Sequence, residues 1–463
     1  MRKFALAVAT ALIGGALLMP VAAQEELPEF IQHSDCEVDL TGETVTVYHF
    51  GDISGAYAFI TQPLLAGVAD ALEYYNARGG VCGATLAQDN RDTGGDLAQT
   101  QAAYDYYKGL EPKPSLLLLY ASGDSELLRS QLEADEIPAV LSAGSVAGLY
   151  GEDGQTPGWA YATNPLYADQ IGSFCDFASS EMGMGMYGEA PTIGYISWPG
   201  AFGGAAYTPE TIAYCAEKGV TILDTPEVFL PSDTDISTQV QNLVDSGANI
   251  LYTNTLATGP ALVAKTITDL GLEEDVQLAG VNWALDTSVG LLGRTSIGSD
   301  GLPSVNGIVG SLPFRWWSER DNPGIALVNE IATLKERTLP TQNIAYLLGF
   351  STVDFYIELY TQTVNRVGSL DAVDGAAIKE TLDSIVYSPL GIYDVDFAGG
   401  ELRSTTPNRM AMMMFANATM DGVATSGDDA LKIPQEDGTN IFVPVLAPLG
   451  EFAPAPDLRP GGE

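Results

Sequence analysis

The chain has 463 residues, enough for more than one hydrophobic core, because single domains usually contain about 100–200 residues. It carries 60 acidic and 20 basic side chains, and its formal net charge of −40 excludes nucleic acid as a partner and disfavours binding to anionic lipid. We interpret this acidity as a solvated surface, suited to salty surroundings that screen the repulsion, rather than as a device for binding cations.

The N-terminus has the pattern of a cleaved secretory signal peptide. A short basic start precedes an apolar stretch, and Val21-Ala22-Ala23 then offers small residues for cleavage. We predict a signal peptide over residues 1–23, a mature start at Gln24 and a periplasmic location. A membrane anchor is the alternative, but the apolar stretch is shorter than the ~20 residues that a span needs. An irregular leader over residues 24–43 follows.

Four cysteines remain in the mature chain, and an even count in an oxidising compartment suggests two disulfides. Three pairings are possible. We favour Cys36–Cys82 and Cys175–Cys215, because each pair then lies within one proposed half of the protein and closes a moderate loop. Metal binding is the weaker alternative, since the cysteines are far apart and the chain has only 2 histidines. We expect no metal and no cofactor.

Strands and helices alternate in the first part of the mature chain. The apolar run SLLLLY is typical of a strand buried on both faces. Three strands end in loops rich in glycine and serine, and in open parallel sheets ligands bind beyond the carboxyl ends of the strands. We therefore expect binding at these loops. The predicted strands are 44–50, 84–88, 115–120 and 138–141, and the predicted helices are about 63–78, about 96–108 and a third ending at 136.

A second alternating series follows Asn164-Pro165, and the whole order of elements predicts an α/β fold. A helix through residue 175 opens the series, and hairpin-like sequence from 388 to 415 closes it; the tail beyond about 433 shows no packing pattern. The strands expected between them are 192–197, 220–224, 250–253, 277–279 and 305–312, and the helices are 209–218, 236–246, 260–270, about 345–367 and 374–385.

In this order of elements the chain resembles the type I periplasmic binding proteins, specifically the branched-chain amino acid (leucine/isoleucine/valine) receptors of ABC transporters. The resemblance covers residues 44–415 and is carried by GDISGAYA, YYNARGGVCGATLAQDNRDTGGDLAQTQAAYDYY, IPAVLSAGSVAGLY, SDTDISTQVQNLVDSGANILYTNTLATGPALVAKTITDLGL and YSPLGIYDVDFAGGELR. It implies two Rossmann-like lobes with parallel sheets, joined by a three-crossover hinge that closes over a ligand.

The resemblance also implies how the chain divides between the lobes. Crossovers are expected near Asn164-Pro165, near Gly307–Gly310 and near Ser388-Pro389. Lobe 1 would then contain residues 44–164 and 309–388, lobe 2 residues 165–308 and 389–432, and an irregular tail residues 433–463.

The family's ligand positions can be transferred to this chain one at a time. Ser122, at the family's usual carboxylate-binding serine, and Gly123 follow the SLLLLY strand, and a serine hydroxyl beside loop amides is suited to an anion. The other positions follow strands or line the lobe boundary: Gly144 and Ser145 after IPAVL, Phe202 at a usual tyrosine, Asn254 and Thr255 after ILYT, Asn282 and Trp283 after QLAGV, and the aromatic Tyr57.

Asn282 departs from the family pattern. In the leucine receptors an acidic residue at this position pairs with the ligand's ammonium group, whereas asparagine offers no counter-charge. Asp286 and Asp124 are candidate substitutes. An amino acid, an amide and an aromatic or other small carboxylate all stay open as ligands, and the predicted aromatic residues would suit a flat or apolar one.

Each of these residues also has a purely structural interpretation. Ser122 and Ser145 could simply cap helices, and the aromatic residues could belong to the core. For the whole chain we predict a monomeric, non-enzymatic binding component of an ABC importer, which takes a small-molecule ligand and works with an inner-membrane permease. A ligand sensor of the same fold is one alternative. A hydrolase is the other, and it would have to use His49.

Overall fold

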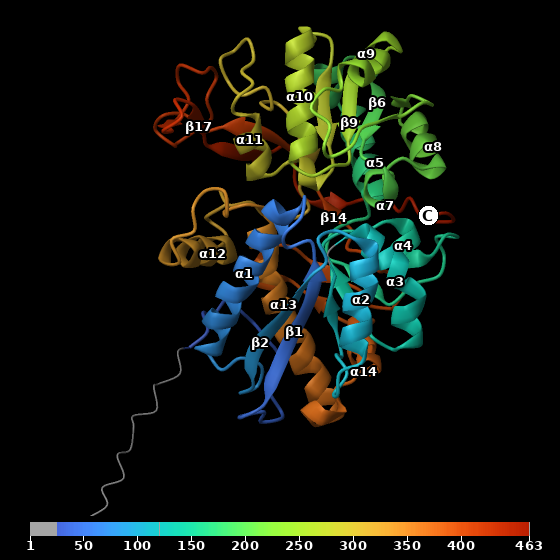
Figure 1. Cartoon of the computed structure of the whole chain (residues 1–463), viewed down its shortest axis with the longest axis vertical. Helices are drawn as coiled ribbons and strands as arrows, with labels where there is room; N and C mark the ends of the chain where they lie inside the picture. The colour runs from blue at the N-terminus through green and yellow to red at the C-terminus, as the bar shows by residue number, and fades with distance from the viewer. Residues whose placement is uncertain (1–25, 120, 463) are drawn as a thin grey trace, which may run out of the picture.

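The computed structural model describes residues 26–119 and 121–462, so the predicted signal peptide and the Gln24 start lie outside the described residues. The chain forms two lobes stacked along the long axis, each built on its own sheet with helices packed around it (Figure 1). This confirms the predicted α/β fold with parallel sheets.

Lobe 1 is built on a parallel sheet with the strand order β2-β1-β3-β4-β5. Its strands are β1 (Thr44–Gly51), β2 (Thr85–Asp92), β3 (Leu117–Leu118), β4 (Ala139–Leu141) and β5 (Ala160–Ala162). The helices between them are α1 (Ala58–Asn76), α2 (Leu97–Lys108), α3 (Ser122–Ala134) and α4 (Val146–Tyr150). A later part of the chain adds α12 (Pro323–Leu334), α13 (Ile344–Val367), η2 (Leu370–Ala372) and α14 (Gly375–Leu382).

Lobe 2 contains the larger sheet, with the order β18-β15-β11-β10-β9-β6-β7 and β8 paired to β6. Its parallel strands are β6 (Thr192–Ser197), β7 (Thr221–Ile222), β8 (Glu227–Val228), β9 (Ile250–Thr253), β10 (Gln277–Gly280) and β11 (Val309–Ser311). Antiparallel β15 (Met410–Phe415) and β18 (Pro444–Pro448) form one edge. The helices are α5 (Tyr167–Ala178), α6 (Glu181–Tyr187), α7 (Gly200–Gly203), α8 (Pro209–Glu217), α9 (Ser237–Asp245), α10 (Thr258–Leu270), η1 (Asn282–Ala284) and α11 (Thr287–Gly293).

The second crossover falls just beyond the expected residues 307–310, and the third lies well beyond the expected Ser388-Pro389. We expected residue 309 to return the chain to lobe 1, but β11 pairs with β10 and β15 in the larger sheet, so the second crossover follows Ser311. The third was expected near Ser388-Pro389. There the chain forms η3 (Pro389–Gly391) and folds back, because β12 (Val386–Tyr387) pairs with β13 (Val395–Asp396). It then runs beside β5 at residues 403–405 and crosses only after that.

The C-terminal tail, expected to be irregular, contains several strands. β18 pairs with β15 along its whole length, and prolines at its two ends are tolerated because it is an edge strand. The remaining strands form small antiparallel pairs: β16 (Lys432–Pro434) with β17 (Asn440–Phe442), and β14 (Pro407–Asn408) with β19 (Ala453–Pro454).

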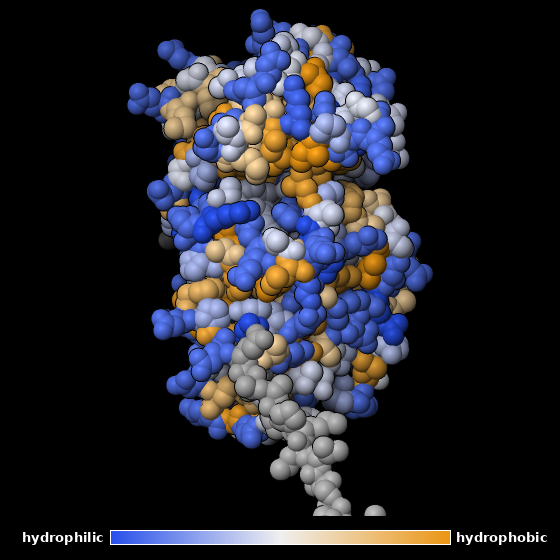
Figure 2. Space-filling view, turned by 90° about the vertical axis from the view of Figure 1, so that its left-hand side faces the viewer, coloured by the Kyte–Doolittle hydropathy of each residue, from blue (hydrophilic) through white to orange (hydrophobic). Residues whose placement is uncertain are grey.

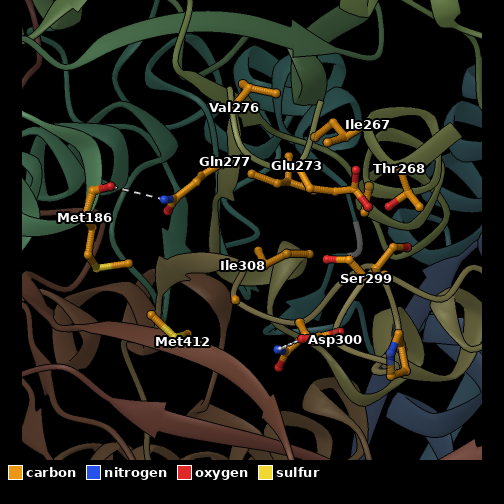
Figure 3. Close-up of a pocket in the computed structure, with 17 residues that line it drawn as sticks. Met186, Ile267, Thr268, Glu273, Val276, Gln277, Ser299, Asp300, Ile308 and Met412 are labelled. Atoms are coloured by element: carbon orange, nitrogen blue, oxygen red, sulfur yellow. Dashed lines mark hydrogen bonds between the residues drawn. The ribbon is translucent and has the colours of Figure 1, made fainter. Parts of the chain in front are cut away.

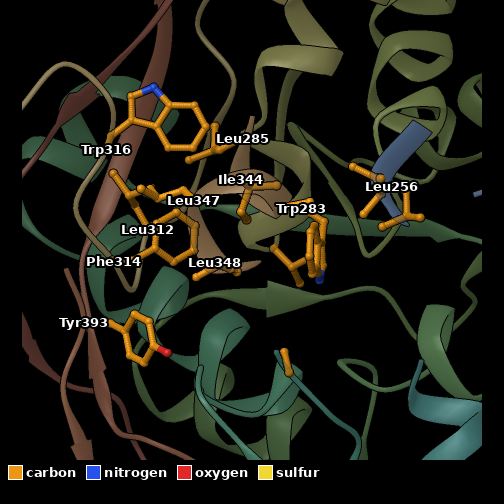
Figure 4. Packing of buried hydrophobic residues seen from close by; sticks show 14 of the residues in the cluster. Leu256, Trp283, Leu285, Leu312, Phe314, Trp316, Ile344, Leu347, Leu348 and Tyr393 are labelled. Carbon is orange, nitrogen blue, oxygen red and sulfur yellow. The ribbon is translucent and has the colours of Figure 1, made fainter. Parts of the chain in front are cut away.

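One hydrophobic cluster is continuous from one lobe to the other, and a second, separate cluster lies in lobe 1. Figure 4 shows Leu285 of lobe 2, Phe314 of the second crossover and Leu347 of α13 packed together in the continuous cluster. Both predicted disulfides form, each with a Cα–Cα distance of 5.4 Å. Each therefore cross-links the chain within a single lobe. Within residues 26–119 and 121–462, no helix has the length and apolar character needed to cross a membrane.

Candidate functional site

A narrow cavity of 90 Å3 lies where the two lobes meet. Lobe 1 contributes the N-terminal part of α1, the ends of β3 and β4, the start of α3 and Thr352 of α13, while lobe 2 contributes the start of α5, α7 and the loops after β9 and β10. Its lining residues are Tyr57, Ile60, Leu64, Leu118, Leu119, Ala121, Ser122, Val140, Leu141, Ser142, Ala143, Tyr167, Phe202, Leu256, Trp283 and Thr352. The volume lies below the roughly 300–1,000 Å3 of typical ligand pockets. The lobes are therefore close together here, with room for a small solute only.

Four of the predicted ligand residues line this inter-lobe cavity: Tyr57, Ser122, Phe202 and Trp283. Trp283 donates its ring N–H to the Tyr167 hydroxyl at 3.0 Å, which fixes the orientation of the indole. Tyr57 reaches across the boundary, and its ring stacks on that of Trp198 with 5.6 Å between the ring centres.

Ser122 is the polar residue of interest on the lobe 1 side. It begins α3, and its side chain is almost completely buried. Its hydroxyl lies beside that of Tyr167, but it makes no hydrogen bond of regular geometry to any residue that the structure describes. A buried hydroxyl without a partner costs about 1–3 kcal/mol, so a solute that supplied the missing bond would recover this free energy.

The other predicted residues do not line the cavity. Gly123 and Gly144 pack against leucine side chains. Ser145 caps α4 by accepting a bond from the Gly148 amide, and its hydroxyl donates to Glu126 at 2.6 Å. In lobe 2, Asn254 donates to the Phe202 carbonyl and Thr255 bonds to Thr253, so both shape the loops that carry the cavity wall.

Asn282 lies behind this wall, next to Trp283 in η1. Its backbone N–H donates to Gln170 Oε1 at 2.9 Å. Both polar atoms of its side chain are buried, and neither has a hydrogen-bond partner in the described part of the chain. An amide left in this way can pair with a group that offers both a donor and an acceptor, such as a hydroxyl, an amide or a water molecule.

All the described residues around the cavity are uncharged. The two carboxylates considered as substitutes for the family's acidic residue have other roles. Asp286 accepts bonds from the Ser288 and Ile344 amides, and burial raises its pKa. Asp124 accepts from the Thr100 hydroxyl and the Ala121 amide. Neither lines the cavity.

Sequence reasoning missed most of the apolar lining and also Tyr167. The apolar residues sit at strand ends inside runs such as SLLLLY, which indicate a buried strand and do not distinguish core from cavity wall. Tyr167 follows the first crossover, and it could have been considered for that reason alone.

His49, the residue on which a hydrolase would depend, is buried in β1. Its Nδ1 lies 3.1 Å from the Leu118 carbonyl, and burial lowers its pKa to about 4. It does not line the inter-lobe cavity. Within the described residues, no group of three or more His, Cys, Asp or Glu side chains is placed to hold a metal ion.

Further hollows lie outside this cavity, two of them away from the predicted ligand residues. One, of 320 Å3, belongs to lobe 2 alone; in Figure 3 it is bounded by Ile267 of α10, Gln277 of β10 and Ile308 before β11. The other, of 690 Å3, lies between Phe59 of α1 and Leu291 of α11. The face drawn in Figure 2 shows apolar side chains gathered on the upper lobe beside the lobe boundary. Neither hollow contains a predicted ligand residue.

A search with the periplasmic binding protein family matches residues 44–422, which is most of the chain. The chain belongs to the periplasmic binding protein family. It is of the type I, leucine/isoleucine/valine-receptor-like group. A search of curated proteins finds no match.

Solved structures share the fold at low sequence identity. A branched-chain amino acid ABC transporter protein from Thermus thermophilus with bound valine has 17% identity and a TM-score of 0.66, over 89% of this chain and 98% of that one. A fatty acid ABC transporter substrate-binding protein from Thermomonospora curvata has 16% and 0.68, over 92% and 96%. A solute-binding protein from R. palustris in complex with 4-hydroxybenzoate has 16% and 0.65, over 89% and 98%. At these identities the likeness supports the fold alone.

Proposed function

We propose that this periplasmic binding protein takes a small aromatic carboxylate between its lobes, without converting it, and delivers it to an ABC permease. The observation that carries the proposal is the inter-lobe cavity, which is small, rich in aromatic and aliphatic side chains, and free of charged side chains among its described lining residues. Such walls suit a flat apolar body.

The uncharged walls argue against a zwitterionic amino acid. A buried ammonium group needs a carboxylate partner, because an unpaired buried charge is costly. Asn282 stands where the leucine receptors have that carboxylate, and Asp124 and Asp286 are bonded elsewhere. A carboxylate on the solute can instead be held by the Ser122 hydroxyl together with the amino-terminal end of α3, which carries partial positive charge.

In the proposed complex a shift of Trp283 opens the cavity to Asn282 behind it, and the unpaired amide of Asn282 then favours a second polar group on the solute. A ring hydroxyl offers both a donor and an acceptor, as this amide requires. One structural relative was solved with 4-hydroxybenzoate, which has such a hydroxyl opposite its carboxylate. We therefore choose 4-hydroxybenzoate as the probe for this chain, with L-valine as its counterpart.

The experiment is calorimetric titration of the mature protein with both probes. We expect 4-hydroxybenzoate to bind, L-valine to bind far more weakly, and mass spectrometry to recover the bound probe unchanged. Ser122→Ala should weaken binding about tenfold or more, because a hydrogen bond to a charged group contributes about 1.5–3 kcal/mol. Ser179→Ala is the matched control, since its hydroxyl bonds to Asp176 at the far end of α5. The affinity of Ser179→Ala for 4-hydroxybenzoate should match that of the parent protein.

Asn282→Asp tests the specificity argument directly. A carboxylate at this position supplies the counter-charge that an ammonium group needs, and it can no longer donate a hydrogen bond to the ring hydroxyl. We expect this variant to lose affinity for 4-hydroxybenzoate and to gain affinity for L-valine. Preferential binding of L-valine by the parent protein would contradict the proposed ligand class, and conversion of the probe would contradict the binding role.

A further inference from the structure

The end of the described chain crosses between the lobes for a fourth time. β19 pairs in antiparallel fashion with β14, which lies in the third crossover, and the Ala455 amide continues the pairing by donating to the Thr406 carbonyl. Because β14 leads from lobe 1 to lobe 2, its antiparallel partner leads back towards lobe 1. We call residues 453–462 the strap; in Figure 1 it ends between α7 of the upper lobe and α4 of the lower lobe.

On lobe 2 the strap is seated against α5. The Leu458 amide donates to Asp169 Oδ1 at 2.9 Å, and the Leu458 side chain is buried. Gly172, one turn further along the helix, makes room for it. A Cβ added at Gly172 would lie 2.6 Å from Pro456 Cγ and 2.7 Å from Leu458 Cδ1. The packing of the strap on α5 therefore depends on the absence of a side chain at this position.

On lobe 1 the strap contacts the end of α4 and the loop behind it. The Arg459 guanidinium lies over the Tyr150 ring, 4.2 Å from its centre, and Asp457 Oδ1 holds the guanidinium in place at 2.8 Å from Nε. Pro460 packs onto Gly154, where an added Cβ would come within 2.3 Å of its ring. The strap thus contacts both lobes within a few consecutive residues.

The strap also borders the gap between the lobes. A hollow of 450 Å3 lies beside it, bounded by Ser145 and Ala147 of lobe 1, by Ala201 and Ala205 of lobe 2, and by Leu458 and Pro460 of the strap. Hinge opening would move α4 away from α7. A segment bound to both lobes must then lose its contacts with one of them, because such short-range contacts vanish within a few ångströms of separation.

We propose that the strap is a tether that favours the closed arrangement of the lobes, and so slows their opening and the release of solute. Its contacts to lobe 1 are a cation–π pair and proline packing, which exist only while the lobes are close. Its contacts to lobe 2 are the packing of the buried Leu458 side chain and the hydrogen bond from the Leu458 amide to Asp169. On opening, the strap would stay with lobe 2 and leave Tyr150, and this loss of contacts opposes opening.

The test measures lobe separation in the ligand-free protein by pulsed electron resonance. Spin labels are placed at Leu97→Cys and Val228→Cys, two exposed positions at the cleft-side ends of lobe 1 and lobe 2. All four native cysteines are in disulfides and do not compete for the label. The doubly labelled parent protein is compared with three labelled variants: a truncation before residue 453, Gly172→Ala and the control Gly185→Ala. The methyl added at Gly185 would have no atom within 4 Å.

We expect the truncation and Gly172→Ala both to shift the distance distribution to longer values, and Gly185→Ala to leave it unchanged. An unchanged distribution in both strap variants would overturn the proposal. If the truncated chain fails to fold, Gly172→Ala decides alone, because alanine suits a helix and only the strap contact opposes it. Since no solute is present, the outcome does not depend on the proposed ligand.

Discussion

At the scale of single residues, Asp169 is a carboxyl whose surroundings favour its neutral form. It is buried in the first turn of α5, and burial raises its pKa to about 8. The Leu458 amide and Arg459 oppose this rise, Asp457 adds to it, and the Leu166 amide and Tyr150 face the same carboxyl. In the unfolded chain an aspartate has a pKa of about 3.9. Folding therefore takes up a proton at Asp169 between these two values.

The pH dependence of stability follows from that proton. The contribution of Asp169 is fully present below about pH 4, and it is lost as pH rises towards about 8, by up to about 1.4 kcal/mol for each pH unit. Asp169→Asn keeps an acceptor for the Leu458 amide and cannot ionise. We expect the free energy of unfolding, measured by urea titration, to be similar for variant and parent at pH 4 and higher for the variant at pH 8. A variant less stable than the parent at pH 8 would contradict this.

The roles of single residues could be predicted where they depend on neighbours close in sequence. The favoured cysteine pairing, one disulfide within each proposed lobe, is the one that forms, and two residues directly after strands, Ser122 and Trp283, line the inter-lobe cavity. Ser145 could not be assigned this way, because its hydroxyl is bonded to Glu126, a residue of another helix. Tyr167 gave no pattern of its own, since its role depends on a contact with Trp283 far along the chain.

At the scale of elements, the closest helix packing in lobe 1 depends on a pair of glycines. α1 and α13 approach so closely that a Cβ at Gly349 would lie 2.2 Å from the Leu64 carbonyl oxygen, and one at Gly67 equally close to the Tyr346 carbonyl oxygen. Backbone atoms cannot move aside as a flexible side chain can. The two helices, and with them the wall formed by Leu64 and Thr352, are positioned by this contact.

Gly349→Ala should therefore destabilise lobe 1. Alanine gains up to about 1 kcal/mol in helix propensity, but overpacking typically costs about 1–3 kcal/mol, and contact with a backbone oxygen belongs at the upper end. We expect a net loss of about 1–2 kcal/mol by urea unfolding. Gly185→Ala, which meets no atom within 4 Å, should be neutral or stabilising. If the two variants had equal free energies of unfolding, the prediction would be wrong, because α1 and α13 could then move apart without an energetic cost.

Element positions were predictable because they depend on short-range pattern. The strands 192–197 and 250–253 and the helix near 345–367 lie where periodicity placed them, within a residue at each end. Sheet membership was not predictable in the same way. β11 joins lobe 2, and β12 folds back onto β13, because of pairing partners distant in sequence. The tail strands were missed because they are short and proline-rich, so they show no alternation.

At the scale of the whole molecule, the charge is far from balanced. With 60 acidic and 20 basic side chains, the carboxylates exceed by 40 the number that basic side chains could balance one to one. Pairs such as Lys218–Asp176 and Lys265–Asp269 are solvent-exposed, where an ion pair contributes about 0–1 kcal/mol. Such pairs cannot offset the mutual repulsion of the carboxylates, which destabilises the compact folded state more than the extended unfolded chain.

Screening this repulsion should stabilise the folded protein. Raising NaCl from 0.01 to 0.5 M shortens the screening length from about 30 Å to less than 10 Å, so the thermal unfolding midpoint should rise with salt. If the effect is general screening, potassium and choline chloride must act as sodium chloride does at equal ionic strength. A midpoint that falls with salt would show that ion pairs dominate. A full rise at millimolar Ca²⁺ or Mg²⁺, with none from choline, would instead assign the acidity to specific cation binding.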